Sequence, residues 1–210
     1  MRIRITFSKL GALRYTGHLD LHRLWERAAR RAELPLAYSQ GFHPQPKITI
    51  AAALPLGFSS RCEMIDLRLE HDISLDGLQE KLQETLPTGI QLAAIEAVDE
   101  RAPALQTQVA AAEYEVILTD SSTTLRADGS ELKWRIDSVM ESESIIRERR
   151  GKTYDLRPLI ESLEVSPEGK IFMRLSAREG ATGRPEEVLD VLGIAFEGTR
   201  IERTRLIFHS

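Results

Sequence analysis

The spacing of apolar residues changes repeatedly along the first hundred residues, and this change is what most constrains the fold. Alternation of apolar and polar side chains predicts a half-buried strand, whereas apolar residues three and four positions apart predict an amphipathic helix. Ile3, Ile5 and Phe7 alternate with polar residues, and Leu21 and Trp25 belong to a helical stripe. The predicted elements are strand 2–8, helix 20–32, strands 47–53 and 63–70, helix 74–86 and strand 90–98. This β-α-β-β-α-β order matches the ferredoxin-like split βαβ motif.

The second half of the chain predicts another α+β unit. Residues 101–112 are rich in Ala and Gln and contain a proline, so we interpret them as a linker. The elements predicted after it are strands 114–119, 144–150, 170–177 and 200–208, and helices 131–140, 156–163 and 185–192. We therefore expect an α+β fold with mainly antiparallel sheets, made of a ferredoxin-like domain over 1–100 and a ferredoxin-like variant over 113–210. No convincing sequence repeat relates the two halves.

Charge is distributed unevenly along the chain. The formal net charge is −4, yet residues 1–61 contain ten Lys and Arg against three Asp and Glu, so this segment carries +7 and the remainder −11. A basic segment of this kind indicates a surface for an anionic partner. The single cysteine, Cys62, excludes an intramolecular disulfide. Together with the lack of a leader-like N-terminus or an apolar run near ~20 residues, this predicts a cytoplasmic protein without a membrane segment.

Four arginines share one face of the helix predicted over 20–32, opposite its apolar stripe. They follow one another at i, i+4, i+7 and i+8: Arg23, Arg27, Arg30 and Arg31. Guanidinium groups bind phosphate oxygens bidentately, so this face predicts phosphate binding. The alternative is a solvated helix face partly paired with Glu26. Lys9, Arg14 and Lys47 in the flanking segments favour an anion site.

Residues 39–47 form the most unusual stretch, because prolines and a glycine fix its backbone. Pro44 and Pro46 restrict φ at their own positions and bias the preceding residues towards extended geometry, while Gly41 permits a conformation denied to other residues. We predict a stiff loop that suits recognition of a base and a phosphate. Phe42 is expected to pack into the core, leaving His43 and Lys47 as the binding residues. A rigid connection without a binding role is the alternative.

The sequence His18-Leu-Asp20-Leu-His22 has the spacing of a metal-binding helix, but we predict no metal there. Histidines at i and i+4 share a helix face, whereas Asp20 lies roughly opposite them and would not complete the site. Asp20 or Thr16 instead suits a helix cap. His18 and Asp20 could also form an acid–base pair with His43, although no nucleophile accompanies them. We expect no cofactor, because the chain lacks nucleotide-binding glycine motifs and one cysteine cannot hold an iron–sulfur cluster.

A second basic island lies in the acidic remainder of the chain. Strand alternation places two of its arginines on one side, and a turn at Gly151 brings its lysine towards the last arginine. We interpret the island as a second anion-binding patch or as a charged edge strand that resists aggregation. Its members are Arg147, Arg149, Arg150, Lys152 and Arg157.

Several of these segments together resemble the radical SAM-linked protein family, a domain of unknown function found beside or fused to cobalamin-type radical SAM proteins. The resemblance lies in residues 7–15, 18–23, 34–39, 41–47 and 149–160. The family pattern has Ser where this chain has Gly17. The resemblance implies a radical SAM protein as partner. That partner would bring its own cluster and cofactor.

From these observations we expect a non-catalytic accessory module that binds RNA and acts with a radical SAM partner. The RNA assignment rests on the basic segment and the two predicted ferredoxin-like units, and the partner rests on the resemblance. Two alternatives stay open. One is an enzyme with an acid–base site formed by His18, Asp20 and His43, and the other is a protein–protein adaptor whose arginines meet an acidic surface.

Overall fold

The structure is a computed structural model that describes residues 1–119, 129–149 and 151–209. The chain divides into two compact units, Met1–Val109 and Ala110–Ser210, which are called unit 1 and unit 2 below. No helix among the described residues combines the length and the apolar character needed to cross a bilayer.

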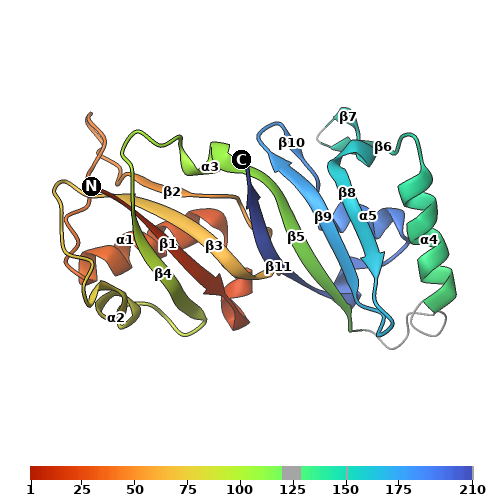
Figure 1. The fold of residues 1–210 in the computed structure, drawn as a ribbon, viewed down its shortest axis with the longest axis horizontal. Coiled ribbons are helices and arrows are strands. Elements are labelled where there is room, and N and C mark those ends of the chain that lie inside the picture. The colour runs from red at the N-terminus through yellow and green to blue at the C-terminus, as the bar shows by residue number, and fades with distance from the viewer. Residues whose placement is uncertain (120–128, 150, 210) are drawn as a thin grey trace. The chain divides into compact units, whose positions relative to one another are not determined.

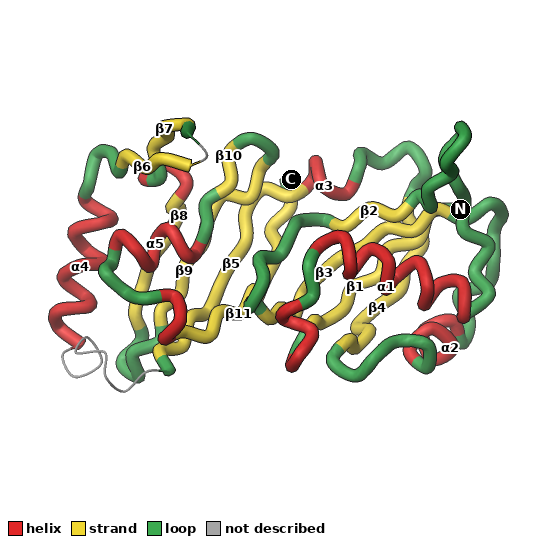
Figure 2. The backbone as a smooth tube through the Cα atoms, turned by 180° about the vertical axis from the view of Figure 1, so that it is seen from behind, coloured by secondary structure: helices red, strands yellow, loops and turns green. Residues whose placement is uncertain are grey.

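Unit 1 is an antiparallel sheet with two helices on one of its faces (Figure 2). Its strands lie in the order β4-β1-β3-β2, and each is antiparallel to its neighbour. A 3₁₀ turn, η1, precedes the first helix, and a short helix, α3, follows the last strand. The elements are β1 (Arg2–Lys9), η1 (Gly11–Tyr15), α1 (His18–Arg31), β2 (Ile48–Ile50), β3 (Ser59–Arg68), α2 (Leu78–Gln83), β4 (Ile90–Val98) and α3 (Leu105–Gln108).

The core of unit 1 lies between β1 and α1. Alternate residues of β1 are fully buried, as the period of two predicts, and they face the apolar stripe of α1. The rings of Phe7 and Trp25 meet edge to face with their centroids 4.7 Å apart. Burial of this stripe leaves the opposite face of α1 exposed, and that face carries the arginines.

Unit 2 has the same strand order as unit 1. Its first strand, β5, lies between β11 and β9, and β8 pairs with β9 at the edge, so the order is β11-β5-β9-β8. A separate hairpin, β6–β7, lies between α4 and β8 in the sequence (Figure 1). The elements are β5 (Val109–Leu118), α4 (Gly129–Glu141), β6 (Ile146–Arg149), β7 (Lys152–Asp155), η3 (Arg157–Leu159), β8 (Ile160–Val165), β9 (Ile171–Arg178), β10 (Ala181–Thr182), α5 (Pro185–Val191), η4 (Phe196–Gly198) and β11 (Thr199–Phe208).

The α+β class with a mainly antiparallel sheet is confirmed, whereas the ferredoxin-like description of each unit stays a prediction. The helix predicted over 156–163 is wrong: a single 3₁₀ turn, η3, leads directly into β8. A register shift between Ile160 and Ser162 interrupts the alternation of β8, so Ile160 and Leu163 are both buried although they are three residues apart, a spacing typical of a helix. The segment 101–112, expected to be a linker, contains α3 and the start of β5.

Candidate nucleic-acid interface

Three arginines of α1 line a groove beside the end of α2. Arg23, Arg27 and Arg31 follow one another at intervals of four residues, so they form a row along one side of the helix. The groove has a volume of about 610 Å³, and its other wall comes from residues 84–87, which follow α2. Leu24 and Leu86 add apolar surface to the same groove. The arrangement combines a row of cations with an apolar wall, which suits a ligand that carries both charge and flat rings.

The three arginines differ in their ion pairs. Arg23 lies 3.6 Å from Asp20, and both side chains are more than two-thirds exposed. Arg27 and Arg31 are exposed, and neither side chain forms a hydrogen bond or an ion pair with any residue that the structure describes. Glu84 lines the groove without forming an ion pair with either of them. Arg27 and Arg31 therefore offer guanidinium groups that an external anion can bind.

Arg30 faces another direction and joins α1 to the loop 39–47. Its Nε and Nη2 donate to the Tyr38 hydroxyl at 3.1 and 2.9 Å, and Nη2 also lies 2.8 Å from a Glu26 carboxylate oxygen. The hydrogen bond to Tyr38 and, secondarily, the Glu26 charge raise the pKa of Arg30 above its ordinary value. The predicted face of four arginines is therefore a row of three, with Arg30 holding the start of the loop.

The loop 39–47 is closed at its base and projects from the fold (Figures 1 and 2). The Ser39 N–H donates to the Gln45 carbonyl at 2.8 Å, and the Gln45 N–H donates to the Ser39 hydroxyl at 2.9 Å. The Lys47 N–H donates to the Ala37 carbonyl, which fixes the strand that leaves the loop. His43 and Lys47 are both exposed, as expected for binding residues.

Phe42 is fully exposed at 102 %, so its assignment to the core is wrong. The chain reverses direction at this point: Gly41 has φ of 126° and Ser39 and Gln45 pair with each other, which carries residues 40–44 away from the sheet. Apolar side chains contribute much of the surface of folded proteins, so the apolar character of Phe42 does not by itself place it in the core.

Of two predicted flanking cations, Lys9 serves the fold and Arg14 contacts its neighbour Tyr15. Lys9 is 1 % exposed and its Nζ donates to the Thr16 carbonyl at 3.0 Å, which ties the end of β1 to the start of α1. The Arg14 guanidinium lies over the Tyr15 ring, 4.7 Å from its centroid. Lys9 is therefore not available at the surface, whereas Arg14 is half-buried near the N-terminal end of α1.

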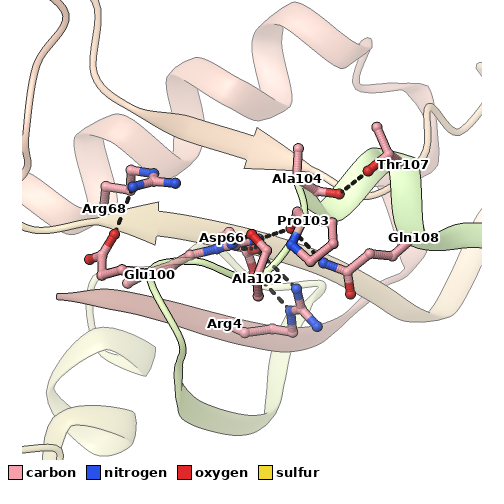
Figure 3. Close-up of polar contacts among 10 residues, drawn as sticks. Arg4, Asp66, Arg68, Glu100, Ala102, Pro103, Ala104, Thr107 and Gln108 are labelled. Carbon is pink, nitrogen blue, oxygen red and sulfur yellow. Dashed lines mark hydrogen bonds and ion pairs between the residues drawn. The ribbon is translucent and has the colours of Figure 1, made fainter.

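Two further arginines of the basic segment are paired in an ion cluster on the sheet face away from α1 (Figure 3). Asp66 of β3 accepts hydrogen bonds from the guanidinium groups of Arg2 and Arg4, and Arg2 also donates to the carbonyls of Ala102 and Pro103. Arg2 and Asp66 are each 3 % exposed. Sequence reasoning missed this cluster because Asp66 lies just beyond the basic segment and becomes a neighbour only through the β1–β3 register.

Two arginines of the basic island of unit 2 pair with acidic residues of α5. Arg147 pairs with Asp190, and Arg149 lies 3.7 Å from Glu187. The Tyr154 hydroxyl donates to Glu187, and burial together with this hydrogen bond raises the pKa of Tyr154 to about 12. The phenol is therefore protonated at neutral pH and remains a hydrogen-bond donor.

The other members of the island have separate roles. Arg157 donates to the Ile160 carbonyl at 2.9 Å and to the Met140 carbonyl at 2.8 Å, where it satisfies the C-terminal end of α4. Lys152 is exposed beside Arg149 across the hairpin. Arg150 lies outside the described residues. The island is thus largely a structural network between the β6–β7 hairpin, α4 and α5.

The three residues of the alternative acid–base site are not brought together. His18 is the first residue of α1, and Asp20 lies at the same end beside Arg23. His43 belongs to the loop that contacts Arg30 at the opposite end of this 14-residue helix, which is about 21 Å long. Gly17, not Asp20 or Thr16, is the N-cap of α1. Within the described ranges, no three His, Cys, Asp or Glu side chains gather in an arrangement that could hold a metal.

Comparison with known proteins yields one family. Residues 2–185 match the model described as "Uncharacterized protein conserved in bacteria (DUF2344)". No curated protein matches the sequence. Among solved structures, the chain is similar to an unknown protein from Galdieria sulphuraria, with 14% identity, 98% of each chain covered and a TM-score of 0.29. A likeness of that size establishes neither a shared fold nor a shared function.

Proposed function

The chain belongs to the DUF2344 family of uncharacterized bacterial proteins, and from this premise we propose that it is a non-catalytic RNA-binding module whose ligand lies along α1. The observation that carries the proposal is the row formed by Arg23, Arg27 and Arg31 in an open groove. Arg27 and Arg31 are exposed, and no carboxylate of the described residues pairs with either of them.

The geometry of the row supports a polyanion in preference to a small anion. Side chains four residues apart on a helix are separated by a rise of about 6 Å, so the three guanidinium groups meet charges in series. A single phosphate would engage one or two of them. The apolar wall that includes Leu24 and Leu86 gives the sugar or base of a nucleotide a surface to contact.

A radical SAM protein remains the proposed partner, on the strength of the motif resemblance in residues 7–47 and 149–160. In this scheme the present chain holds the RNA and the partner supplies the reaction. Co-purification of the two proteins with and without nuclease checks this part. Loss of the pair on nuclease treatment indicates bridging by RNA, and an unchanged pair indicates direct docking through protein surfaces.

The binding proposal is tested by titrating the full chain with fluorescently labelled tRNA and a single-stranded oligoribonucleotide between about 50 and 200 mM salt. The double variant Arg27→Gln/Arg31→Gln is expected to bind more weakly and to show a shallower dependence of affinity on salt. For a single strand, the slope becomes shallower by about 0.7 for each phosphate that the protein no longer neutralises. The variant is expected to fold normally because both side chains are exposed, and circular dichroism checks this.

The matched control is Arg200→Gln/Arg205→Gln, which removes the same charge from exposed positions on β11 of unit 2. This control is expected to retain the affinity and the salt slope of the unmodified chain. Binding that is absent at low salt, or insensitive to salt, contradicts the proposal. An equal loss of affinity in the control variant also contradicts it, because the attraction would then be a property of overall charge.

A further inference from the structure

We propose that Phe42 is a base-stacking residue that makes the chain select RNA with unpaired bases over duplex RNA. This inference rests on the proposed function and deepens it, since it names the conformation of the nucleic acid. Bases in a duplex are stacked on one another and hide their faces, whereas a single strand presents each base to an aromatic side chain. An exposed ring at the end of a projecting loop meets that requirement.

Phe42 is fully exposed and does not belong to a larger apolar patch. The ring is 102 % exposed, and its neighbours Gln40, Gly41, His43 and Pro44 are also exposed. Apart from the adjoining proline these neighbours are polar or small, so Phe42 is not the centre of an apolar patch. A specific protein interface buries more than ~1,000 Å² around an apolar centre, which this loop does not provide. A single ring among polar residues suits one planar base.

The loop restricts the backbone that carries the ring. Ser39 and Gln45 close its base with two mutual hydrogen bonds, and Pro44 and Pro46 restrict the backbone on one side of the tip. Gly41 adopts φ of 126°, a conformation that a residue with a side chain rarely adopts. A loop whose backbone is already restrained loses less conformational entropy when its tip binds a ligand.

The charge around the loop favours a nucleic acid. The sequence contains no Asp or Glu between Glu33 and Glu63, so no carboxylate of this segment repels a phosphate. Lys47 is exposed where the loop returns to the sheet. Arg30 joins Tyr38, at the start of the loop, to the helix that carries Arg27 and Arg31. The loop is thus tied to the C-terminal half of α1, the helix whose other side carries the arginine row.

The test compares a single-stranded oligoribonucleotide with the blunt duplex of the same sequence. Phe42→Ala is expected to lower the affinity for the single strand on the order of 10-fold and to leave the affinity for the duplex unchanged. Phe42→Tyr retains an aromatic ring and is expected to keep the preference for the single strand. Trp134→Ala, which truncates a 67 % exposed aromatic of α4 in unit 2, is the matched control and is expected to change neither affinity.

A second measurement reports on the ring directly. Trp25 is buried, so Phe42→Trp in a Trp134→Phe background places an exposed indole at the tip alone. Addition of the single strand is expected to quench its fluorescence. Unchanged thermal unfolding of Phe42→Ala shows that the fold is intact, as expected for a fully exposed side chain.

The outcomes separate this inference from the proposed function. If Phe42→Ala binds the single strand normally while Arg27→Gln/Arg31→Gln does not, the stacking role is overturned and the RNA-binding function stands. If neither variant differs from the unmodified chain, both proposals fail. If Phe42→Ala binds RNA normally but loses a co-purifying protein after nuclease treatment, the loop is a protein-docking element and the stacking role is likewise overturned.

Discussion

Arginines of the same basic segment have opposite roles, and their surroundings decide which role each one has. Arg2 is buried and gives both its charge and its hydrogen bonds to Asp66 and to two carbonyls. Arg27 is exposed in the groove and pairs with none of the described carboxylates. A buried charge must be paired, because its desolvation costs several kcal/mol, whereas an exposed one remains solvated and free to bind. A count of charges along the sequence treats the two alike.

Replacement of Asp66 tests whether the buried ion cluster stabilises the fold. Asp66→Asn leaves Arg2 and Arg4 without their common negative partner, so we expect the free energy of unfolding to fall by about 3–5 kcal/mol. Lys81→Ala removes a 3.0 Å ion pair with Glu33 between exposed side chains and is expected to cost less than about 1 kcal/mol. Urea denaturation measures both. Equal losses of stability would show that the buried cluster contributes no more than a surface pair.

Burial could be predicted from sequence where apolar and polar residues alternate along a strand. Burial or pairing could not be predicted where it depends on how a loop closes or on the register between two strands. Ile3, Ile5 and Phe7 were correctly placed in the core because alternation on a strand directly encodes burial. Phe42 was misplaced because the exposure of a loop tip depends on how the loop is closed, here by Ser39 and Gln45. Asp66 could not be paired with Arg2 without the register between β1 and β3.

At the scale of the element, one carboxylate holds the two ends of the β6–β7 hairpin by hydrogen bonds. Asp155, at the end of β7, accepts hydrogen bonds from the Ile145 N–H at 2.7 Å and from the Arg157 N–H at 3.0 Å. These bonds link the hairpin to the segment after α4 and to η3. The hydrogen bond from Ile145 is the largest cause that lowers the pKa of Asp155 below its ordinary value.

This lowered pKa predicts a specific acid sensitivity. Because the pKa of Asp155 is lower in the folded chain than in the unfolded chain, its contribution to stability is present above about pH 4 and is lost as the pH falls through the folded value. The difference in free energy of unfolding between the unmodified chain and Asp155→Asn is therefore expected to be positive at pH 7 and to shrink towards pH 3. Denaturation curves at several pH values measure it. A difference that is constant with pH would refute this role.

The elements of the two units were not equally predictable. The four strands of unit 1 and the helices α1 and α2 follow the predicted order along the chain, whereas α3 lies in the segment expected to be a linker. In unit 2, Ile160 and Leu163 of β8 have the three-residue spacing of a helix, and a helix is predicted there from the sequence. The register shift in β8 allows both residues to be buried in a strand. A bulge changes the period of a strand without leaving a mark in residue type, so periodicity alone cannot reveal it.

At the scale of the whole molecule, the arginine row that we propose as the ligand site belongs to unit 1. The exposed arginine row and Lys47 both lie there. In unit 2, Arg147 and Arg149 are paired with the acidic residues of α5. Unit 1 as a whole contains 13 Lys and Arg and 13 Asp and Glu, so its basic character is local to α1 and the loop 39–47. Arg2, Arg4 and Lys9 of the basic segment are bound within the fold.

Hydrogen exchange measured with and without RNA tests this asymmetry across the chain. We expect RNA to slow exchange in the C-terminal half of α1 and in the loop 39–47, and to leave the β6–β7 hairpin unchanged. The protection should disappear in Arg27→Gln/Arg31→Gln and persist in Arg200→Gln/Arg205→Gln. Protection centred on the hairpin would assign the interface to the island of unit 2 instead.

The loop closed by Ser39 and Gln45 also bears on how this chain can diverge. Its tip contributes nothing to the core, and its base is held by hydrogen bonds that do not depend on the side chain at position 42. Substitutions at position 42 therefore carry almost no cost in stability, unlike those at Gly41 with its φ of 126°, and under the proposed function they act on recognition. Under the proposed function, a mutation at position 42 alone changes the ligand preference while the fold stays under separate constraint.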